Sequence, residues 1–217
     1  MFILVTCDPI LPNSYRPGNN GGDGLVAARH LVHFGLDATV VYPKQSSKTH
    51  FINLVKQCED MGIPILEEIP MDTEDGYDVI VDAIFGFSFH GTAPREPFAT
   101  AIANMVELQK QQKSLLVSVD VPSGWDVDGG DLTGTNFHPD VLVSLTAPKL
   151  SSKKFRGRHF VGGRFLPPAI AEKYGIRVSD FALVVDNFIS RVVFACNWLF
   201  LVGFRNNVWP CSCVLHL

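Results

Sequence analysis

The sequence lacks a long hydrophobic run, an excess of positive charge and a regular set of cysteines. Each absence excludes a class of protein or ligand. The apolar stretch Val192–Phe204 has 13 residues, whereas a membrane-spanning helix needs about 20. The chain has 18 basic and 22 acidic residues, and no basic run offers a surface for nucleic acid. We therefore expect a small polar ligand, with no nucleic acid and no membrane span.

The five cysteines are odd in number and unevenly spaced, which is typical of a reduced protein rather than a disulfide scaffold. Cys211 and Cys213 lie close together, but no pair of His or Cys at zinc-ligand spacing accompanies them. Met1–Thr6 lacks the basic start and long apolar core of a signal peptide, so it is predicted to be a strand. No targeting segment is identified, which leaves the compartment open between the cytoplasm, a plastid and a mitochondrion.

Apolar runs rich in β-branched residues alternate with helical patterns along most of the chain. Such runs are typical of strands buried on both faces of a parallel sheet, and the alternation predicts a doubly wound α/β fold. The expected strands are Phe2–Thr6, Ala38–Tyr42, Ile63–Leu66, Val79–Ile84, Leu115–Val119 and Val141–Leu145. The expected helices are Leu25–Phe34, His50–Met61 and Pro97–Gln111. Ligands of such sheets bind beyond the carboxyl ends of the strands, so a site is expected there.

The segment Pro17–Gly24 contains four glycines, so a ligand could lie directly against its main chain. A helical run follows at once, and the loop is expected to present its amides at a helix N-terminus, where anions bind. Gly22–Ala27 matches the pattern of dinucleotide-binding dehydrogenases, but the second strand ends in Tyr42-Pro-Lys44 without the acidic residue that holds the ribose. No Gly-Lys-Ser/Thr follows, which excludes a P-loop. The alternative is a turn without a ligand.

Two carboxylates lie at the ends of expected strands. Asp82 interrupts an apolar strand, where an ionised carboxylate needs a counter-charge. This is either a Lys or Arg side chain or a cation held by oxygens of Asn20, Asp82 and Ser123, which suit an alkali or alkaline-earth ion. Asp120 follows the next strand, and Pro122 restricts the residue before it to extended conformations. Asp120 is therefore the candidate general acid or base, with a cap or turn as its alternative role.

Other polar side chains near these loops have weaker claims to a chemical role. Ser123 lacks the G-x-S-x-G pattern of a hydrolase nucleophile, so we do not expect it to attack a substrate. His90 lies in the loop Gly86–Gly91 and is expected to contact a ligand or face solvent, with proton transfer as an alternative. Lys149 and the basic cluster at 153–158 are expected to be solvated, or else to meet a ligand phosphate.

Three motifs, in this order and spacing, resemble the NAD(P)H-hydrate epimerase family. They are Pro17-Gly-Asn-Asn-Gly-Gly-Asp-Gly24, Val81-Asp-Ala-Ile-Phe-Gly-Phe-Ser-Phe-His-Gly91 and Val119-Asp-Val-Pro-Ser-Gly-Trp125, and the likeness runs over residues 17–174. The sequence Lys153-Lys-Phe-Arg-Gly157 is most similar to plant members, in which this domain can precede a pyridoxamine-phosphate oxidase domain. The resemblance implies a domain over 1–175 with a Rossmann-like three-layer α-β-α sandwich and a mostly parallel central sheet.

The resemblance also implies an isomerase that interconverts the R and S forms of hydrated NADH and NADPH, so that an S-specific dehydratase can restore the cofactor. It implies Asp120 as the catalytic residue, one potassium ion per subunit on Asn20, Asp82 and Ser123, and a homodimer. The implied substrate contacts are Asn19, Asn20, Gly21, Gly22, Asp23, Gly86, Phe87, Ser88, Phe89, His90, Gly91, Thr92 and Asp120. We hypothesise that Asp120 moves a proton to or from the C6 hydroxyl while the ring nitrogen assists C–O cleavage, giving a planar cation that water re-enters from either face.

Both ends of the chain depart from the family pattern. The stretch Asp8–Arg16 separates the first strand from the glycine motif, and Phe2–Thr6 stands in as a displaced first strand. The family's N-terminal helices have no counterpart, and the apolar tail at 176–217 matches nothing in the family. An inactive form that binds a nucleotide or a protein partner is therefore the alternative to an active epimerase.

Overall fold

A computed structural model of the 217-residue chain describes nine segments of it. They are residues 2–6, 15–16, 19–44, 46–72, 76–90, 93–112, 114–132, 134–162 and 167–175. The tail at 176–217 lies outside the described residues, and so do Gly18, Gly91 and Thr92. The domain boundary expected after residue 175 stays a prediction.

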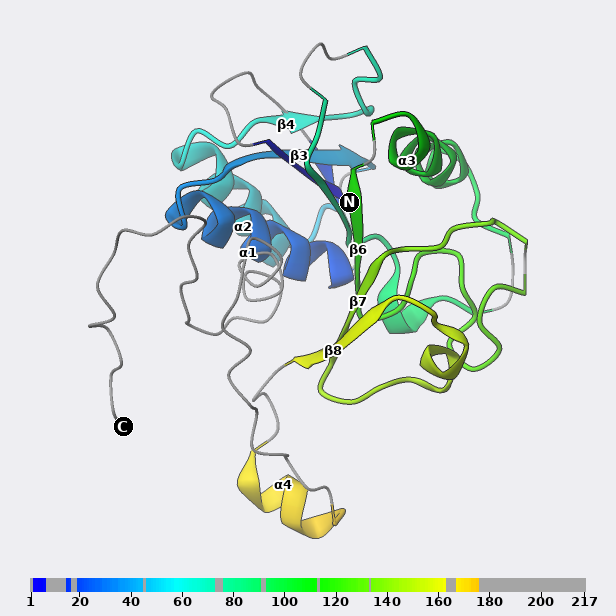
Figure 1. The fold of residues 1–217 in the computed structure, drawn as a ribbon. Helices are drawn as coiled ribbons and strands as arrows, with labels where there is room; N and C mark the ends of the chain where they lie inside the picture. Colours follow the sequence, from blue (N-terminus) through cyan, green and yellow to red (C-terminus); the bar gives the residue numbers. More distant parts are fainter. Residues whose placement is uncertain are drawn as a thin grey trace, which may run out of the picture.

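A mostly parallel, eight-stranded sheet forms the centre of the fold (Figure 1). Its order is β2-β3-β1-β5-β6-β7-β8, with β4 paired to β3. The strands are β1 (Phe2–Thr6), β2 (Tyr15–Arg16), β3 (Asp37–Pro43), β4 (Ile65–Leu66), β5 (Val79–Asp82), β6 (Leu115–Val119), β7 (Val141–Leu145) and β8 (Arg158–Gly162). All six strands that the apolar runs predict are present. The runs do not predict β2 and β8, because neither has a continuous apolar sequence.

Among the described strands, only β1 runs antiparallel to its neighbours. It lies between β3 and β5, with Phe2 opposite both Val41 and Asp82. The expectation of a strand at Phe2–Thr6 is confirmed, and one antiparallel strand agrees with the expected mostly parallel sheet. An apolar run indicates burial and carries no information about strand direction. The amino end of β1 therefore lies at the edge where β3 and β5 end.

Helices cover both faces of the sheet, so the expected three-layer α-β-α sandwich is confirmed. The helices α1 (Asn19–His33) and α2 (Thr49–Asp60) share one core with Val79 and Val81. The helix α3 (Phe98–Gln112) packs on the other face with Ile80, because alternate residues of a strand point to opposite faces. The short helices are η1 (Gly86–Ser88), η2 (Leu150–Lys154) and α4 (Pro168–Lys173). No helix in the described part of the chain is long and apolar enough to cross a membrane.

Residues 19–24 of the glycine motif form the start of α1 rather than a loop in front of it. The helix begins at Asn19, not at Leu25 as the sequence predicts. A Cβ on Gly22 would lie 3.2 Å from Cε1 of Phe51 in α2, which is tighter than ordinary carbon contact. The interpretation of residues 19–24 as a loop is therefore wrong. Gly22 has a packing role here, because its lack of a side chain lets α1 approach α2.

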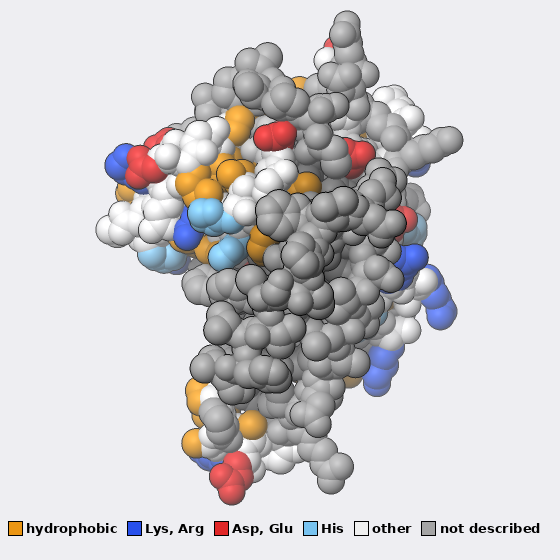
Figure 2. All heavy atoms as spheres, turned by 60° about the vertical axis from the view of Figure 1, so that its left-hand side comes forward, with side chains coloured by type: hydrophobic (Ala, Val, Ile, Leu, Met, Phe, Trp, Pro, Cys, Tyr) orange, Lys and Arg blue, Asp and Glu red, His pale blue; other side chains and the backbone are white. Residues whose placement is uncertain are grey.

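The outer surface of α1 and α2 carries histidine side chains beside exposed apolar ones (Figure 2). The His30 ring lies 6.2 Å from that of His33 and 6.3 Å from that of Phe34. Burial, together with the charges of Arg29 and His33, lowers the pKa of His30 below its usual range. Within the described residues, no group of three or more His, Cys, Asp or Glu side chains could hold a metal ion. This surface therefore provides no such metal centre.

Candidate active site

Asn20, Asp82 and Asp120 meet at the carboxyl ends of β5 and β6, where the sequence predicts a site. Asp82 is the last residue of β5, Asp120 directly follows β6, and Asn20 lies in the first turn of α1. The Asn20 amide donates from Nδ2 to the Val119 carbonyl oxygen at 3.1 Å. This bond ties α1 to the end of β6, so three segments distant in sequence share one edge of the sheet.

The Asp82 carboxylate is fully buried and accepts four hydrogen bonds. Ser118 Oγ donates at 2.7 Å, the Ser123 N–H at 2.9 Å, Ser123 Oγ at 2.5 Å and the Ile84 N–H at 3.3 Å. Burial raises the pKa of Asp82 above its usual range, and the bonds from Ser123 and Ser118 offset part of the rise. Within the described residues, no Lys or Arg forms an ion pair with Asp82. The basic partner weighed as one alternative is therefore not found there.

The Asp120 carboxylate is held from two sides. Its Oδ2 accepts a hydrogen bond from the Phe87 N–H at 2.9 Å, and its Oδ1 accepts one from the Lys149 ammonium. The backbone of Asp120 has φ 72°, in the left-handed region that residues with a side chain seldom adopt. Its own N–H donates to the Val143 carbonyl oxygen at 2.7 Å. Conformations of this kind persist where the surroundings fix them, and they cluster at functional sites.

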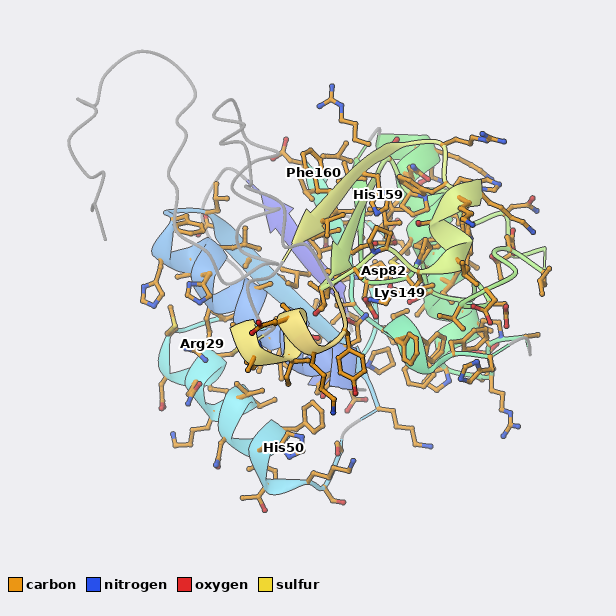
Figure 3. The ribbon with its side chains drawn as sticks, turned by 90° about the horizontal axis from the view of Figure 1, so that it is seen from below. Arg29, His50, Asp82, Lys149, His159 and Phe160 are labelled. Atoms are coloured by element: carbon orange, nitrogen blue, oxygen red, sulfur yellow. The ribbon has the colours of Figure 1, made fainter. Side chains whose placement is uncertain are left out.

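Lys149 is the site residue that the sequence reasoning missed. Its Nζ donates to Asp120 Oδ1 and, at 2.8 Å, to the Leu145 carbonyl oxygen. The Lys149 side chain is only 16% exposed, so the expectation that it is solvated is wrong. It reaches the same edge of the sheet as Asp82 (Figure 3). Its position in the sequence could have indicated this role, because Lys149 closely follows β7, which ends at Leu145, and ligand sites lie beyond the carboxyl ends of such strands.

The loop after β5 contributes backbone groups and an aromatic ring. Gly86 has φ 56°, and a Cβ on it would lie 2.9 Å from Cγ of Asn20, so the close approach requires glycine. The next residue, Phe87, places its ring centroid 6.0 Å from Lys149 Nζ and is 60% exposed. The loop thus touches α1 through Gly86 and Asp120 through the Phe87 N–H.

Asp23 is a half-buried residue of α1, and its carboxyl interacts electrostatically with Asp120. Burial, and to a smaller extent the negative charge of Asp120, raise the pKa of Asp23 from 3.8 to about 6. A carboxyl that titrates this close to neutral pH can exchange protons with a bound ligand. The site therefore holds two carboxyls in different surroundings, one paired with an ammonium and one without an ion-pair partner among the described residues.

The structure describes only some of the remaining residues that are expected to contact substrate. Gly21 and Gly22 lie in α1, and Phe89 follows η1 with its ring stacked on Phe85 at 4.8 Å between centroids. His90 is exposed, which agrees with the solvent-facing interpretation, and the basic residues Lys153, Lys154, Arg156 and Arg158 are exposed as expected. The side chains of Asn19 and Ser88, and all of Gly91 and Thr92, lie outside the described residues. Their substrate contacts stay predictions.

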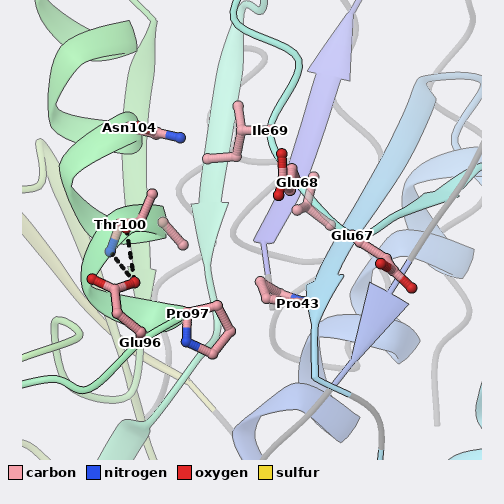
Figure 4. Close-up of a pocket in the computed structure, with 10 residues that line it drawn as sticks. Pro43, Glu67, Glu68, Ile69, Glu96, Pro97, Thr100 and Asn104 are labelled. Carbon is pink, nitrogen blue, oxygen red and sulfur yellow. Dashed lines mark hydrogen bonds between the residues drawn. The ribbon is translucent and has the colours of Figure 1, made fainter.

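A separate cavity of about 240 Å³ lies between the ends of β3 and β4 and the first turns of α3 (Figure 4). Three of its lining residues are Glu67, Glu68 and Glu96. Glu96 accepts hydrogen bonds from the N–H and the hydroxyl of Thr100, at 3.3 and 2.8 Å. Among the described residues, the lining includes no Lys or Arg that could offset the three carboxylates toward an anionic ligand, and neither Asp82 nor Asp120 belongs to it. The site at Asp120, rather than this cavity, is therefore the candidate for nucleotide chemistry.

Known proteins are similar to this chain over most of its length. The family model described as YjeF-related protein N-terminus matches residues 16–151. The NAD(P)H-hydrate epimerase of Puccinia graminis f. sp. tritici is 52% identical over 176 residues, which are 81% of this chain and 68% of that protein. The chloroplastic pyridoxine/pyridoxamine 5'-phosphate oxidase 1 of Arabidopsis thaliana is 52% identical over 76% of this chain, which spans 32% of that relative. The crystal structure of the yeast protein ynu0 is 41% identical, with a TM-score of 0.69 over 78% of this chain and 74% of that one.

Proposed function

Because this chain belongs to the family of YjeF-related protein N-terminal domains, we propose that it is an isomerase that epimerises hydrated nicotinamide cofactors. The reaction interconverts the R and S forms of NADH and NADPH that carry a hydroxyl at C6. The identity of 52% to an NAD(P)H-hydrate epimerase, over 81% of the chain, supports this activity. The oxidase activity in the name of the Arabidopsis relative is not proposed, because the chain spans about a third of that protein.

The observation that carries the proposal is the Asp120 carboxylate, fixed at a strand end between the Phe87 N–H and Lys149. A carboxyl held in this way can exchange a proton with a substrate hydroxyl. In its acid form, Asp120 donates a proton to the C6 hydroxyl, and the lone pair of the ring nitrogen expels water. C6 is then planar, so water adds to either face and its proton returns to the Asp120 carboxylate. One water leaves and one enters, so the reaction is neither an oxidation nor a reduction.

The substrate is proposed to lie between the start of α1 and η1, beside Asp120. Gly21 lies in the first turn of α1, next to Asn20, and helix N-termini favour the negative charge of a pyrophosphate. The exposed ring of Phe87 offers a flat apolar surface for one of the substrate rings. Asp23 adds a second carboxyl that titrates near neutral pH, because its pKa is raised to about 6. These features suit a dinucleotide whose reacting carbon carries a hydroxyl.

We also propose that Asn20, Asp82 and Ser123 hold one potassium ion per subunit. Asp82 and Ser123 are hydrogen-bonded to each other, and the Asn20 amide nitrogen is bonded to Val119, so the Asn20 oxygen points away from that bond. Oxygen ligands of this kind suit a hard cation. The charge of the ion would offset the cost of burying the Asp82 carboxylate. The oxygen ligands support this proposal alongside the family resemblance, and the bound ion would replace one of the four hydrogen bonds that Asp82 accepts.

The metabolic setting that we propose is repair of a damaged cofactor by two enzymes. An S-specific dehydratase would consume the S form, and epimerisation would convert the R form into material for it. We propose a homodimer as the working assembly. The family resemblance supports both statements.

The proposal is tested by following R/S exchange of purified hydrate by chiral chromatography in potassium buffer. We expect wild-type protein to accelerate exchange and Asp120→Asn to be slower by about 10²–10⁴-fold, with hydrate binding still measurable by calorimetry. Asp128→Asn is the control, because Asp128 is an exposed carboxyl. Wild-type protein that binds hydrate without turnover would overturn the activity and support the binding-only alternative. Unchanged turnover in Asp120→Asn would remove Asp120 from its proposed role.

A further inference from the structure

We propose that Lys149 is a positioning residue that holds the Asp120 carboxyl in one orientation, an inference that rests on the proposed epimerase activity. The two side chains form an ion pair and are 16% and 10% exposed. The exposed pair of Lys56 and Asp60, at 69% and 61%, is the contrasting case. Exposed pairs of that kind contribute little, whereas charged hydrogen bonds shielded from water are stronger. The pair at the site can therefore fix the position of the Asp120 carboxyl.

The ammonium of Lys149 is anchored independently of Asp120. A second hydrogen bond joins Nζ to the Leu145 carbonyl oxygen at 2.8 Å. The same carbonyl accepts the Ala147 N–H, and the Thr146 N–H donates to Gly162 of β8, both at 2.8 Å. The turn that carries Lys149 is thus fixed to β7 and β8. Because the lysine is already held, Asp120 meets a positive charge at a defined point rather than a mobile side chain.

The other oxygen of Asp120 is fixed by a different segment. The Phe87 N–H donates to Oδ2 at 2.9 Å, while Lys149 binds Oδ1. Two donors on two different oxygens define the plane of the carboxylate. An ionised carboxylate has about four acceptor positions, so the remaining positions are left for a substrate hydroxyl. Lys149 acts through Asp120 in this arrangement and does not itself touch the reacting atoms.

The charges around Asp120 show what Lys149 adds. The described groups that face Asp120 are the Phe87 N–H of η1, Asp23 of α1, and Lys149 after β7. Lys149 is the positive group of this described set, and Asp23 is negative when ionised. Removing Lys149 should therefore leave Oδ1 of Asp120 without a donor among the described groups and free the carboxyl to turn about its bond to the Phe87 N–H.

The test compares Lys149→Met with Lys149→Arg and with Lys56→Met. Methionine keeps an unbranched stem and removes the charge, whereas arginine restores the charge. We expect Lys149→Met to lower kcat by about 100-fold with a smaller change in KM, because the carboxyl loses its orientation. Lys149→Arg should recover part of the lost kcat, and Lys56→Met should change neither kcat nor KM.

Equal losses of kcat in Lys149→Met and Lys149→Arg would overturn the proposal, because lost packing alone would then explain them. Should Lys149→Met fail to fold, Lys149→Gln keeps a hydrogen-bond donor without the charge and is expected to show the same loss of kcat. A second measurement does not need turnover. In ¹⁵N-labelled protein, the Phe87 N–H resonance should shift in Lys149→Met, because the carboxylate that accepts its hydrogen bond is no longer held, and an unchanged resonance would overturn the role of Lys149. If this resonance responds but wild-type protein shows no epimerisation, the proposed function fails while the inference about Lys149 stands on its own result.

Discussion

Replacing Gly86 with alanine should destabilise the protein and displace Asn20, the residue that lies against it. The added Cβ would lie 2.9 Å from Asn20 Cγ and 3.1 Å from its Nδ2, at a backbone φ of 56°. Carbon atoms in ordinary contact are about 3.5–4.0 Å apart, so either Asn20 or the η1 loop must move. The bond from Asn20 Nδ2 to the Val119 carbonyl oxygen, 3.1 Å long, is the contact that this movement would disturb first.

Two separate costs contribute to the effect of Gly86→Ala. A left-handed backbone costs a residue with a side chain about 1–2 kcal/mol. Forcing an extra methyl group into a packed site costs about 1–3 kcal/mol more. The free energy of unfolding should therefore fall by about 2–5 kcal/mol. In a domain of this size, Tm falls by about 2–4 °C for each kcal/mol lost.

Gly35→Ala is the matched control. Gly35 has φ 74°, but apart from its chain neighbours no atom of the described residues lies within 4 Å of the position of its Cβ. This variant should lose only the backbone part, about 1–2 kcal/mol. Urea unfolding followed by circular dichroism measures both losses, and we expect Gly86→Ala to lose about 1–3 kcal/mol more than Gly35→Ala. Equal losses would refute the reasoning, because they would show that Asn20 moves aside without cost.

Two further predictions concern buried carboxyls. Ser118→Ala removes the 2.7 Å bond to Asp82 and should lower the free energy of unfolding by about 1.5–3 kcal/mol. The control is Ser144→Ala, because the Ser144 hydroxyl is hydrogen-bonded to Nε2 of His159 at 2.8 Å rather than to a carboxylate. Urea unfolding should show a smaller loss of unfolding free energy for Ser144→Ala than for Ser118→Ala, and equal losses would contradict the role of the Asp82 charge. Asp23→Asn should stabilise the protein at pH 7.5, because folding raises the pKa of Asp23 from 3.8 to about 6 and so disfavours its carboxylate. Between pH 3.8 and about 6 the folded state holds a proton that the unfolded state has lost, so the free energy of unfolding of wild type falls as pH rises. Relative to Asp23→Asn, this fall is up to about 3 kcal/mol, and it is smaller where solvent screens the charge. If urea unfolding gives the same difference in free energy between wild type and Asp23→Asn at pH 4 and pH 7.5, the prediction is contradicted.

The strands that the sequence predicts are those in which local pattern and burial coincide. Val79–Val81 and Leu116–Val119 are buried throughout; the first is a continuous apolar run, and the second is apolar except for Ser118. The edge strand β8 pairs with β7 through its backbone, while most of its side chains are exposed. Its pairing therefore leaves little trace in the pattern of apolar residues. The same pattern locates β1 correctly but cannot give its direction.

The start of α1 escaped prediction for a different reason. Glycine weakens a helix by about 1 kcal/mol relative to alanine, so local propensity favours a loop at residues 19–24. The contact between Gly22 and Phe51 overrides that preference, because a larger residue would hold α1 away from α2. Helix propensity describes an isolated segment, whereas this helix start depends on packing against a second helix.

Part of the candidate site was open to prediction from the order of strands and loops. Asn20, Asp82 and Asp120 each lie next to a strand or helix end, and the structure brings them to one edge of the sheet. The partner of Asp120 was not predictable in this way. Lys149 follows a different strand, and nothing in the local sequence specifies which carboxylate its ammonium will meet. Such pairings depend on tertiary structure rather than on motif.

The antiparallel strand β1 makes the continuity of the sheet depend on five residues. It joins β3 to β5, and those two strands have no described pairing with each other. Phe2 must meet both Val41 and Asp82, which lie far along the chain, so closing the sheet requires two long-range contacts that form slowly. We expect β1 to enter late in folding. Until it does, the facing edges of β3 and β5 are unpaired, and such edges can join strands of other molecules. Aggregation during refolding is therefore the specific hazard of this arrangement.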